Sequence, residues 1–383
     1  MSAPQAILHH RVLPSAASDT YSPNQTVDFL LQVPARKLLS GSIRIEGEVT
    51  VTNSAGTVVT KVSRTQLDCF VGAHSFFDQF STEVESKGQM ENLQNYPRMI
   101  NMMSRAGFAQ DDLNTLRMGA EMRAGGKVAN GHYALQPVVE RSNTGVATPA
   151  MTTTPPSFTI KPMICFNRSE GGMYSFDKMG FIRVSTILSS NLMAMFGLAT
   201  TGDAGSRYTL SKLACRYVTI PDDGVVSPQL MRSYVNTVNS VQSTASSLVS
   251  RVPSSRVNGV AISFSTQTNE GDVSKNSLAL ESLPYYISTE YLFANSTSQN
   301  VTYVIRDKGD SIQRGIDALS DSGHTNVSVQ NLAANSAFLI GIPFNEFLDL
   351  SQQLFSMRLV IESTTITSSP MNAYSYFSTL VSL

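Results

Sequence analysis

The sequence predicts an all-β protein with a few inserted helices, arranged as two β-sandwiches in tandem. Three observations support this prediction. Short apolar segments with alternating polar residues occur along the whole chain, and alternation with a period of two is typical of strands that bury one face. The chain has 383 residues, the length of about two domains. A polar segment rich in glycine and threonine interrupts the pattern near the middle, at residues 200–206.

The first half begins with strands of clear alternation. A strand is predicted over 26–33, and a hairpin is predicted from 43–51 and 58–62, with its turn at 53–56. Charged residues alternate with isoleucine and valine in 43–51, so this hairpin has one solvated face. Further strands are predicted at 133–139, 157–166 and 181–188.

Helices are few in this half. One is predicted over 97–106, because Asn95 lies near the cap, Pro97 lies in the first turn and Gly107 follows as a stop. A second, shorter helix is predicted over 111–118.

The segment at 200–206 sets the predicted domain boundary, with 1–203 as the N-terminal domain and 204–383 as the C-terminal domain. A strand over 208–220 is expected to open the second domain. A helix is predicted over 228–249, because its apolar residues fall on one stripe at helical spacing. Strands follow at 260–264, 287–293, 301–305, 338–342, 355–361 and 374–381.

Each half thus offers roughly six to eight alternating strands and one or two helices, which is typical of a two-sheet sandwich of the jelly-roll type. The predicted fold is therefore two tandem eight-stranded jelly-roll β-sandwiches. No sequence repeat at a fixed period relates the halves.

The composition is poor in charge. Charged residues make up 15 % of the chain, against about 25 % in an ordinary soluble domain. Serine, threonine, asparagine and glutamine take their place, and such groups can hydrogen-bond across a subunit boundary without stranding ions. The 28 basic and 29 acidic residues create no net field toward nucleic acid or anionic membranes, and the N-terminus has no basic arm. Neither a signal peptide nor a membrane span is visible, so synthesis in a cytosol is expected.

The metal-binding residue types are dispersed. The three cysteines are odd in number and widely spaced, so buried free thiols are expected at Cys69, Cys165 and Cys215. None of the five histidines has the spacing of a metal ligand: His9, His10, His74, His132 and His324. His74 is interpreted as a core or interface residue because its neighbours are apolar. No metal and no cofactor are expected.

One segment resembles a catalytic motif. Gly309, Asp310 and Ser311, followed by Asp321 and His324, resemble the serine and Asp-x-x-His blocks of Gly-Asp-Ser esterases. In those enzymes Ser311 would be the nucleophile, and Asp321 would orient His324 as the base. The blocks lie far apart in that family but are close together here, and Gly-Asp-Ser also commonly starts a helix. The structural interpretation is favoured, and no catalytic residue is predicted.

Other charged groups receive structural interpretations. The carboxylate pairs 111–112 and 222–223 are interpreted as caps of helices or turns. Five matches to the glycosylation acceptor pattern are attributed to the abundance of asparagine and serine. Four arginines of 98–123 are scattered rather than grouped, so sequence-specific nucleic-acid binding is not expected.

The layout as a whole resembles the double jelly-roll major capsid proteins of tailless icosahedral DNA viruses. The similarity lies in two β domains, a short linker, few charges and no basic arm, with 91–99 and 255–264 reminiscent of the family. It implies a non-enzymatic virion protein that forms trimers of six jelly-rolls, each trimer a pseudo-hexagonal block of an icosahedral shell. Its partners would be further copies, minor capsid or vertex proteins and, in members that enclose one, an internal membrane.

Three alternatives remain open at this stage. A single jelly-roll coat or vertex (penton) protein would have one core. A carbohydrate-binding β-sandwich would usually be secreted and rich in exposed aromatic residues, whereas this chain has no tryptophan and no visible signal peptide. The Gly-Asp-Ser esterase is the third alternative.

Overall fold

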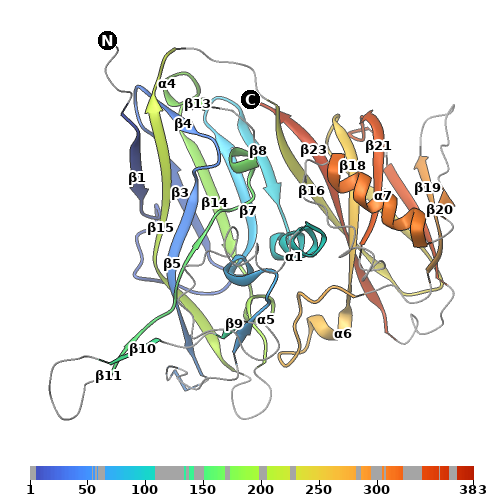
Figure 1. Ribbon diagram of the computed structural model, residues 1–383, viewed down its shortest axis with the longest axis horizontal. Helices are drawn as coiled ribbons and strands as arrows, with labels where there is room; N and C mark the ends of the chain where they lie inside the picture. Colours follow the sequence, from blue (N-terminus) through green and yellow to red (C-terminus); the bar gives the residue numbers. More distant parts are fainter. Residues whose placement is uncertain are drawn as a thin grey trace. The chain divides into compact units, whose positions relative to one another are not determined.

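In the computed structural model, the chain folds into two units (Figure 1). The first unit comprises Met1–Met90, Asp111–Ser227 and Asp272–Asn276, and the second comprises Glu91–Gln110, Pro228–Gly271 and Ser277–Leu383. The structure describes residues 6–53, 55–56, 58, 65–107, 133–134, 138–141, 151–168, 173–197, 205–224, 230–281, 286–294, 304–305, 308–321, 339–352, 354–361 and 369–383.

The first unit is built from two main antiparallel sheets. One sheet has the order β12 (Ser157–Ile160), β5 (Arg44–Thr52), β15 (Arg207–Pro221), β4 (Arg36–Leu39) and β13 (Met173–Ser175), and β15 also pairs with β1 (Leu8–Val12) and β2 (Thr20–Tyr21). The other has the order β3 (Thr26–Leu31), β14 (Ile182–Leu188), β7 (Phe77–Val84) and β8 (Gly88–Leu93). Two short ribbons join β6 (Gln66–Leu67) to β9 (Tyr133–Ala134) and β10 (Val138–Arg141) to β11 (Met151–Thr154).

The second unit contains two four-stranded sheets. The first has the order β16 (Leu230–Val241), β23 (Met371–Ser382), β18 (Val257–Thr266) and β21 (Leu339–Leu348). The second has the order β17 (Ala245–Arg251), β22 (Leu354–Ile361), β19 (Tyr286–Ala294) and β20 (Val304–Ile305).

Both units share one topology. If the eight strands of the second unit are numbered along the chain, its sheets have the orders 1-8-3-6 and 2-7-4-5. The first unit follows the same orders when β1 and β2, β4 and β5, and β12 and β13 each count as one interrupted strand. This Greek-key arrangement is a jelly-roll. The predicted fold class is confirmed, and the alternative of a single jelly-roll is wrong.

Each unit has its own apolar core. Phe76 in the first unit contacts Phe158 and Tyr208, with ring centroids 5.6 and 5.1 Å apart. In the second unit, Phe355 contacts Phe344 and Phe377 at 6.1 and 5.3 Å. The facing sheets of the first unit are joined by Phe77 of β7, which contacts Phe158 of β12 at 6.1 Å, and those of the second unit by the cluster around Phe355. Full burial of one such side chain stabilises the folded state by about 1.5–3 kcal/mol.

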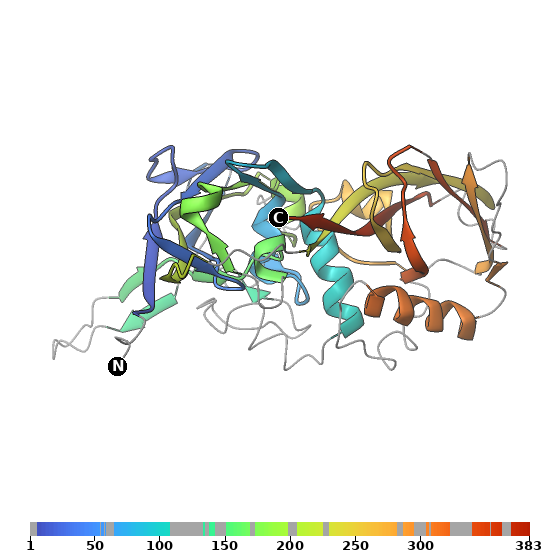
Figure 2. The ribbon, with the colours of Figure 1, turned by 90° about the horizontal axis from the view of Figure 1, so that it is seen from above.

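Among the described residues, two helices are longer than five residues. α1 (Tyr96–Gly107) matches the helix predicted over 97–106, and the backbone N–H groups of Arg98 and Met99 donate to the carbonyl of Asn95 at its start. α7 (Lys308–Asp321) packs on β18 and β21 of the second unit (Figure 2). The helix predicted over 111–118 lies outside the described residues. The short helices are η1 (Gly72–Phe76), α3 (Cys165–Arg168), α4 (Phe176–Met179), α5 (Asn191–Ala194) and α6 (Gln267–Glu270).

The helix predicted over 228–249 is wrong, because β16 and β17 occupy this segment. Exposed and buried residues alternate along β17, which is the period of a strand. The segment is rich in serine, threonine and valine, which form helices poorly, and β23 and β22 provide ladder partners along the full length of both strands. Tertiary pairing therefore overrides the helical spacing of the apolar residues.

The strand that was expected to open the second domain instead closes the first. β15 pairs with β1, β4 and β5, all of them in the first unit. The first unit therefore extends to Ser227, well past the boundary predicted at residue 203. In sequence, the linker-like segment 200–206 therefore precedes β15, the last strand of the first sandwich, and not the first strand of the second. A jelly-roll places its eighth strand beside its first, as β15 lies beside β1.

Most of the other predicted strands are present with shifted ends. The prediction over 133–139 falls on two short strands, β9 and β10, which pair with different partners, and 135–137 lie outside the described residues. The strand predicted over 301–305 is described only at 304–305, and the strand predicted over 338–342 extends to Leu348. The strand predicted over 157–166 ends at Ile160, and residues 165–168 form α3. In the predicted hairpin, the pairing of Thr52 with Val58 is described, whereas 59–62 lie outside the described residues.

Candidate functional site

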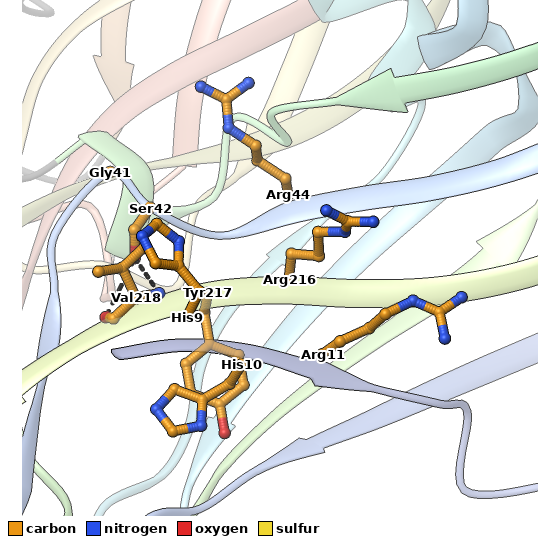
Figure 3. A pocket seen from close by; sticks show the side chains of 9 residues that line it. All are labelled: His9, His10, Arg11, Gly41, Ser42, Arg44, Arg216, Tyr217 and Val218. Atoms are coloured by element: carbon orange, nitrogen blue, oxygen red, sulfur yellow. Dashed lines mark hydrogen bonds between the residues drawn. The ribbon is translucent and has the colours of Figure 1, made fainter. Parts of the chain in front are cut away.

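The first unit has an open pocket of about 650 Å³ where β1, β15 and β5 lie side by side (Figure 3). Its lining is mostly basic or polar: His9, His10, Arg11, Gly41, Ser42, Arg44, Arg216, Tyr217 and Val218. The sequence analysis predicted a site at none of these residues, and it considered His9 and His10 only to reject them as metal ligands.

Three arginines of the lining form a row across the sheet. Arg11 on β1 is the register partner of Arg216 on β15, and Arg216 is the register partner of Arg44 on β5. Residues paired across strands point to the same face, and neighbouring strands are about 4.8 Å apart, so the row spans about 10 Å. We call Arg11, Arg216 and Arg44 the arginine row.

The carboxylate of Glu46 forms ion pairs with two arginines of the arginine row. Oε1 of Glu46 lies 2.7 Å from Nε of Arg11, and Oε2 lies 2.5 Å from Nε of Arg216. Among the described residues, Arg44 has no ion-pair partner. Lys161 adds a fourth cation, since its Nζ lies 3.1 Å from the position that a Cβ on Gly41 would occupy. Burial and the charge of Arg44 lower the pKa of Lys161.

The two adjacent histidines use opposite sides of β1, as expected for neighbours on a strand. The ring of His10 stacks on Tyr217 with centroids 4.9 Å apart, and its Nε2 lies 2.8 Å from Oγ1 of Thr219. Burial, with the charges of Arg36 and His9, lowers the pKa of His10. His9 lies beside Ser42 and Val218 in Figure 3.

The Gly-Asp-Ser segment lies inside the first turn of α7. Nε of Arg314 is 3.0 Å from Oδ1 of Asp310, which makes Asp310 half of an ion pair along the helix. The segment therefore starts a helix, as the structural interpretation predicted. His132 and His324 lie outside the described residues.

The carboxylate pair 222–223 lies at a turn and binds a buried lysine. Lys37 is 4 % exposed and forms ion pairs with Asp222, at 3.7 Å, and with Asp223. Asp222 also accepts hydrogen bonds from the hydroxyl of Ser175 and from the backbone N–H of Gly224. The turn-capping interpretation is confirmed for this pair, whereas 111–112 lie outside the described residues.

The cysteines, His74 and the asparagine of one glycosylation pattern lie in buried or hydrogen-bonded positions of the fold. Cys165 and Cys215 are buried, Cys69 is partly buried, and none of the three is in a disulfide. His74 is buried within η1. Asn167 belongs to one of the glycosylation patterns. Its side chain forms hydrogen bonds with the backbone of Ile43 and Pro162, so the amide is used within the fold.

Within the part of the chain that the structure describes, no group of three or more His, Cys, Asp or Glu side chains is arranged to hold a metal ion. No helix in that part is long and apolar enough to cross a membrane.

The sequence analysis missed the burial of Arg98. This side chain is 1 % exposed within the second unit and forms an ion pair with Glu270 at 3.0 Å. The burial of Arg98 could have been predicted from its neighbours in the sequence, because Met99, Ile100 and two further methionines follow it in α1.

Comparisons with known proteins give a match in fold. No family model matches the chain, and no curated protein matches it. The Faustovirus major capsid protein is similar over 100 % of this chain and 90 % of its own, with a TM-score of 0.57 and 9 % identity. The VP54 protein of PBCV-1 gives a TM-score of 0.61 at 8 % identity, over 100 % of this chain and 96 % of its own. The chain has the double jelly-roll fold.

A third solved structure gives the same result. The mavirus major capsid protein has a TM-score of 0.52 and 9 % identity, and it is covered over 86 % of its length by 97 % of this chain. At such low identities the likeness shows the fold and not a shared sequence. The match covers both sandwiches, because 97–100 % of this chain is included.

Proposed function

We propose that this double jelly-roll chain is a major capsid protein, which assembles with copies of itself into an icosahedral viral shell and has its place in the virion. The observation that carries the proposal is the likeness of the whole chain to viral capsid proteins. A likeness that covered one sandwich would fit many β proteins, whereas two jelly-rolls in one chain are a more specific arrangement.

The sheet edges of the second unit support self-association. In its described sheets, β16 and β17 are edge strands, and β16 has 12 residues. A long edge presents backbone donors and acceptors that another copy can cover. Val238 on β16 and Val249 on β17 are each 47 % exposed, and Leu354 on the neighbouring β22 is 40 % exposed. Burial of these side chains between copies would stabilise an assembly.

The proposed assembly unit is a trimer, in which six jelly-rolls form a pseudo-hexagonal block. Closed symmetry lets every copy use the same contacts, so that modest interfaces add up over a shell. Other copies are the main partners, and minor capsid or vertex proteins and an internal membrane are further partners. A chain with this role has no enzymatic activity, and its function lies in its surfaces.

The first test is the native mass by light scattering, with negative-stain imaging of the same sample. A trimer of three times 41.5 kDa, or shell-like particles, is the expected result. A chain that stays monomeric at every concentration and forms no particles would contradict the proposal.

A matched pair of variants locates the contact. Val249→Glu puts a charge at an exposed apolar position of β17, whereas Ser247→Glu puts the same charge two residues away on the same exposed side. Val249→Glu is expected to weaken association about tenfold or more, because burial of an unpaired carboxylate in the interface costs free energy. Its circular dichroism spectrum should be unchanged. Equal association of both variants with the wild type would place the subunit contact elsewhere.

A further inference from the structure

The positive charge of the arginine row is only partly balanced by carboxylates within the fold. Like charges at directly opposed strand positions destabilise a sheet, yet three arginines follow one another across β1, β15 and β5. Glu46 balances two of them, and Arg44 and Lys161 have no ion-pair partner among the described residues. The cluster thus holds four cations and one carboxylate in and beside an open pocket.

The arginines are accessible to a ligand. The side chains of Arg11 and Arg216 are 49 % and 58 % exposed, although both touch Glu46. An arginine has five N–H donors, and Arg11 and Arg216 each contact Glu46 through Nε. The N–H groups on the other two nitrogens of each guanidinium can therefore donate to a ligand. Figure 3 shows the three side chains leaving neighbouring strands around the pocket.

We propose that the arginine row and Lys161 form a site for phosphate groups. The guanidinium fork matches the oxygens of a phosphate, and arginines that start from neighbouring strands, about 4.8 Å apart, can share one phosphate or hold neighbouring ones. A phosphate monoester carries about two negative charges and three acceptor oxygens, whereas a carboxylate carries one charge and two oxygens. The excess charge of the cluster therefore fits a polyphosphate or a phosphorylated headgroup better than a single acidic side chain.

The chemistry is shared by two sources, soluble polyphosphate and the headgroups of anionic lipids. Isothermal titration of the full-length protein with inorganic tripolyphosphate, at fixed ionic strength, tests the first source. Flotation with phosphatidylcholine vesicles, with and without phosphatidic acid, tests the second. Binding in either arm that depends on Arg44 supports the site and identifies its source.

Arg44→Gln is the informative variant, because Arg44 forms no ion pair with any described residue and its replacement leaves both ion pairs of Glu46 intact. We expect it to weaken binding about tenfold or more, and Arg44→Lys to restore part of the affinity. The matched control is Arg183→Gln, which removes an exposed arginine paired with Glu83 on the other sheet of the same unit.

Three results would overturn the inference. The first is the absence of binding in both arms, which would leave the arginine row as a salt-screened surface. The second is an equal loss of affinity in Arg44→Gln and Arg183→Gln, which would mean non-specific attraction. The third is a poly-glutamate peptide that binds as tightly as tripolyphosphate, which would assign the cluster to an acidic protein segment.

Discussion

The guanidinium of Arg98 lies over the ring of Tyr374, with 4.3 Å between its central carbon and the ring centroid. Glu270 joins the two, since its Oε1 lies 3.0 Å from Nη2 of Arg98 and accepts a hydrogen bond of 2.9 Å from the hydroxyl of Tyr374. Arg98 is on α1 and Tyr374 is on the last strand. A cation–π contact and an ion pair thus attach a helix from the first third of the chain to the second jelly-roll.

Removal of the charge of Glu270 should therefore destabilise the second unit. Glu270→Gln leaves a buried guanidinium without its counter-ion, and we expect a loss of about 3 kcal/mol or more in the free energy of unfolding. Urea unfolding followed by tyrosine fluorescence measures it. Glu83→Gln is the control, because it breaks the exposed pair with Arg183 and should cost less than about 1 kcal/mol. Equal costs would show that burial adds nothing to the Arg98 pair.

Acid should weaken the first unit through Asp222. Burial acts to raise the pKa of this carboxyl, but the hydrogen bonds from Ser175 and Gly224 and the charge of Lys37 together hold the pKa below its ordinary value of 3.8. A depressed pKa contributes stability that is present above about pH 4 and lost as the pH falls through the folded-state pKa. Asp222→Asn should therefore be less stable at neutral pH and should lose less stability between about pH 5 and pH 2.

Thermal unfolding of both proteins across that pH range measures the effect. Ser175→Ala should change the profile in the same direction but by less, since it removes one of the hydrogen bonds. Parallel profiles for the wild type and Asp222→Asn would contradict the role of this carboxylate.

The close approach of α7 to β21 should make Gly341 intolerant of a side chain. A Cβ at this position would lie 2.8 Å from Cα of Gly315 and 2.9 Å from Cβ of Ala318, so the helix would have to shift. Gly341→Ala should cost about 1–3 kcal/mol in urea unfolding.

Gly315→Ala on the facing helix is the matched control. Its added Cβ would meet only Leu339, at 3.9 Å, which is an ordinary contact. Alanine also favours a helix over glycine by about 1 kcal/mol, so this variant should be neutral or stabilised. If Gly315→Ala proved as harmful as Gly341→Ala, the close approach would not be the cause.

The three thiols should differ in reactivity. Burial, aided by the charge of Glu46, raises the pKa of Cys215 to about 12, and alkylation requires an accessible thiolate. In the native protein at pH 8, iodoacetamide should modify the partly buried Cys69 first. Cys165 and Cys215 should react at least about a hundredfold more slowly, through transient opening. Peptide mass spectrometry over time measures the order, and early modification of Cys215 would contradict its burial.

Local pattern determined much of the fold. Alternating residues identified most of the strands, because a strand that buries one face needs a period of two wherever its partners lie. Cap and stop residues located α1 to within one residue at each end. The low charge, with serine, threonine, asparagine and glutamine in place of ions, favoured a protein that associates through polar surfaces.

The tertiary structure decided what depends on partners distant in the chain. Residues 230–241 and 245–251 became strands because β23 and β22 offered them complete ladders, and β15 closed the first sandwich because its partners β1 and β5 lie near the N-terminus. The same pairing brought Arg11, Arg216 and Arg44 together from three separate segments. Nothing in the neighbourhood of each arginine predicts this row, because register is set by the burial of whole sheets and not by adjacent residues.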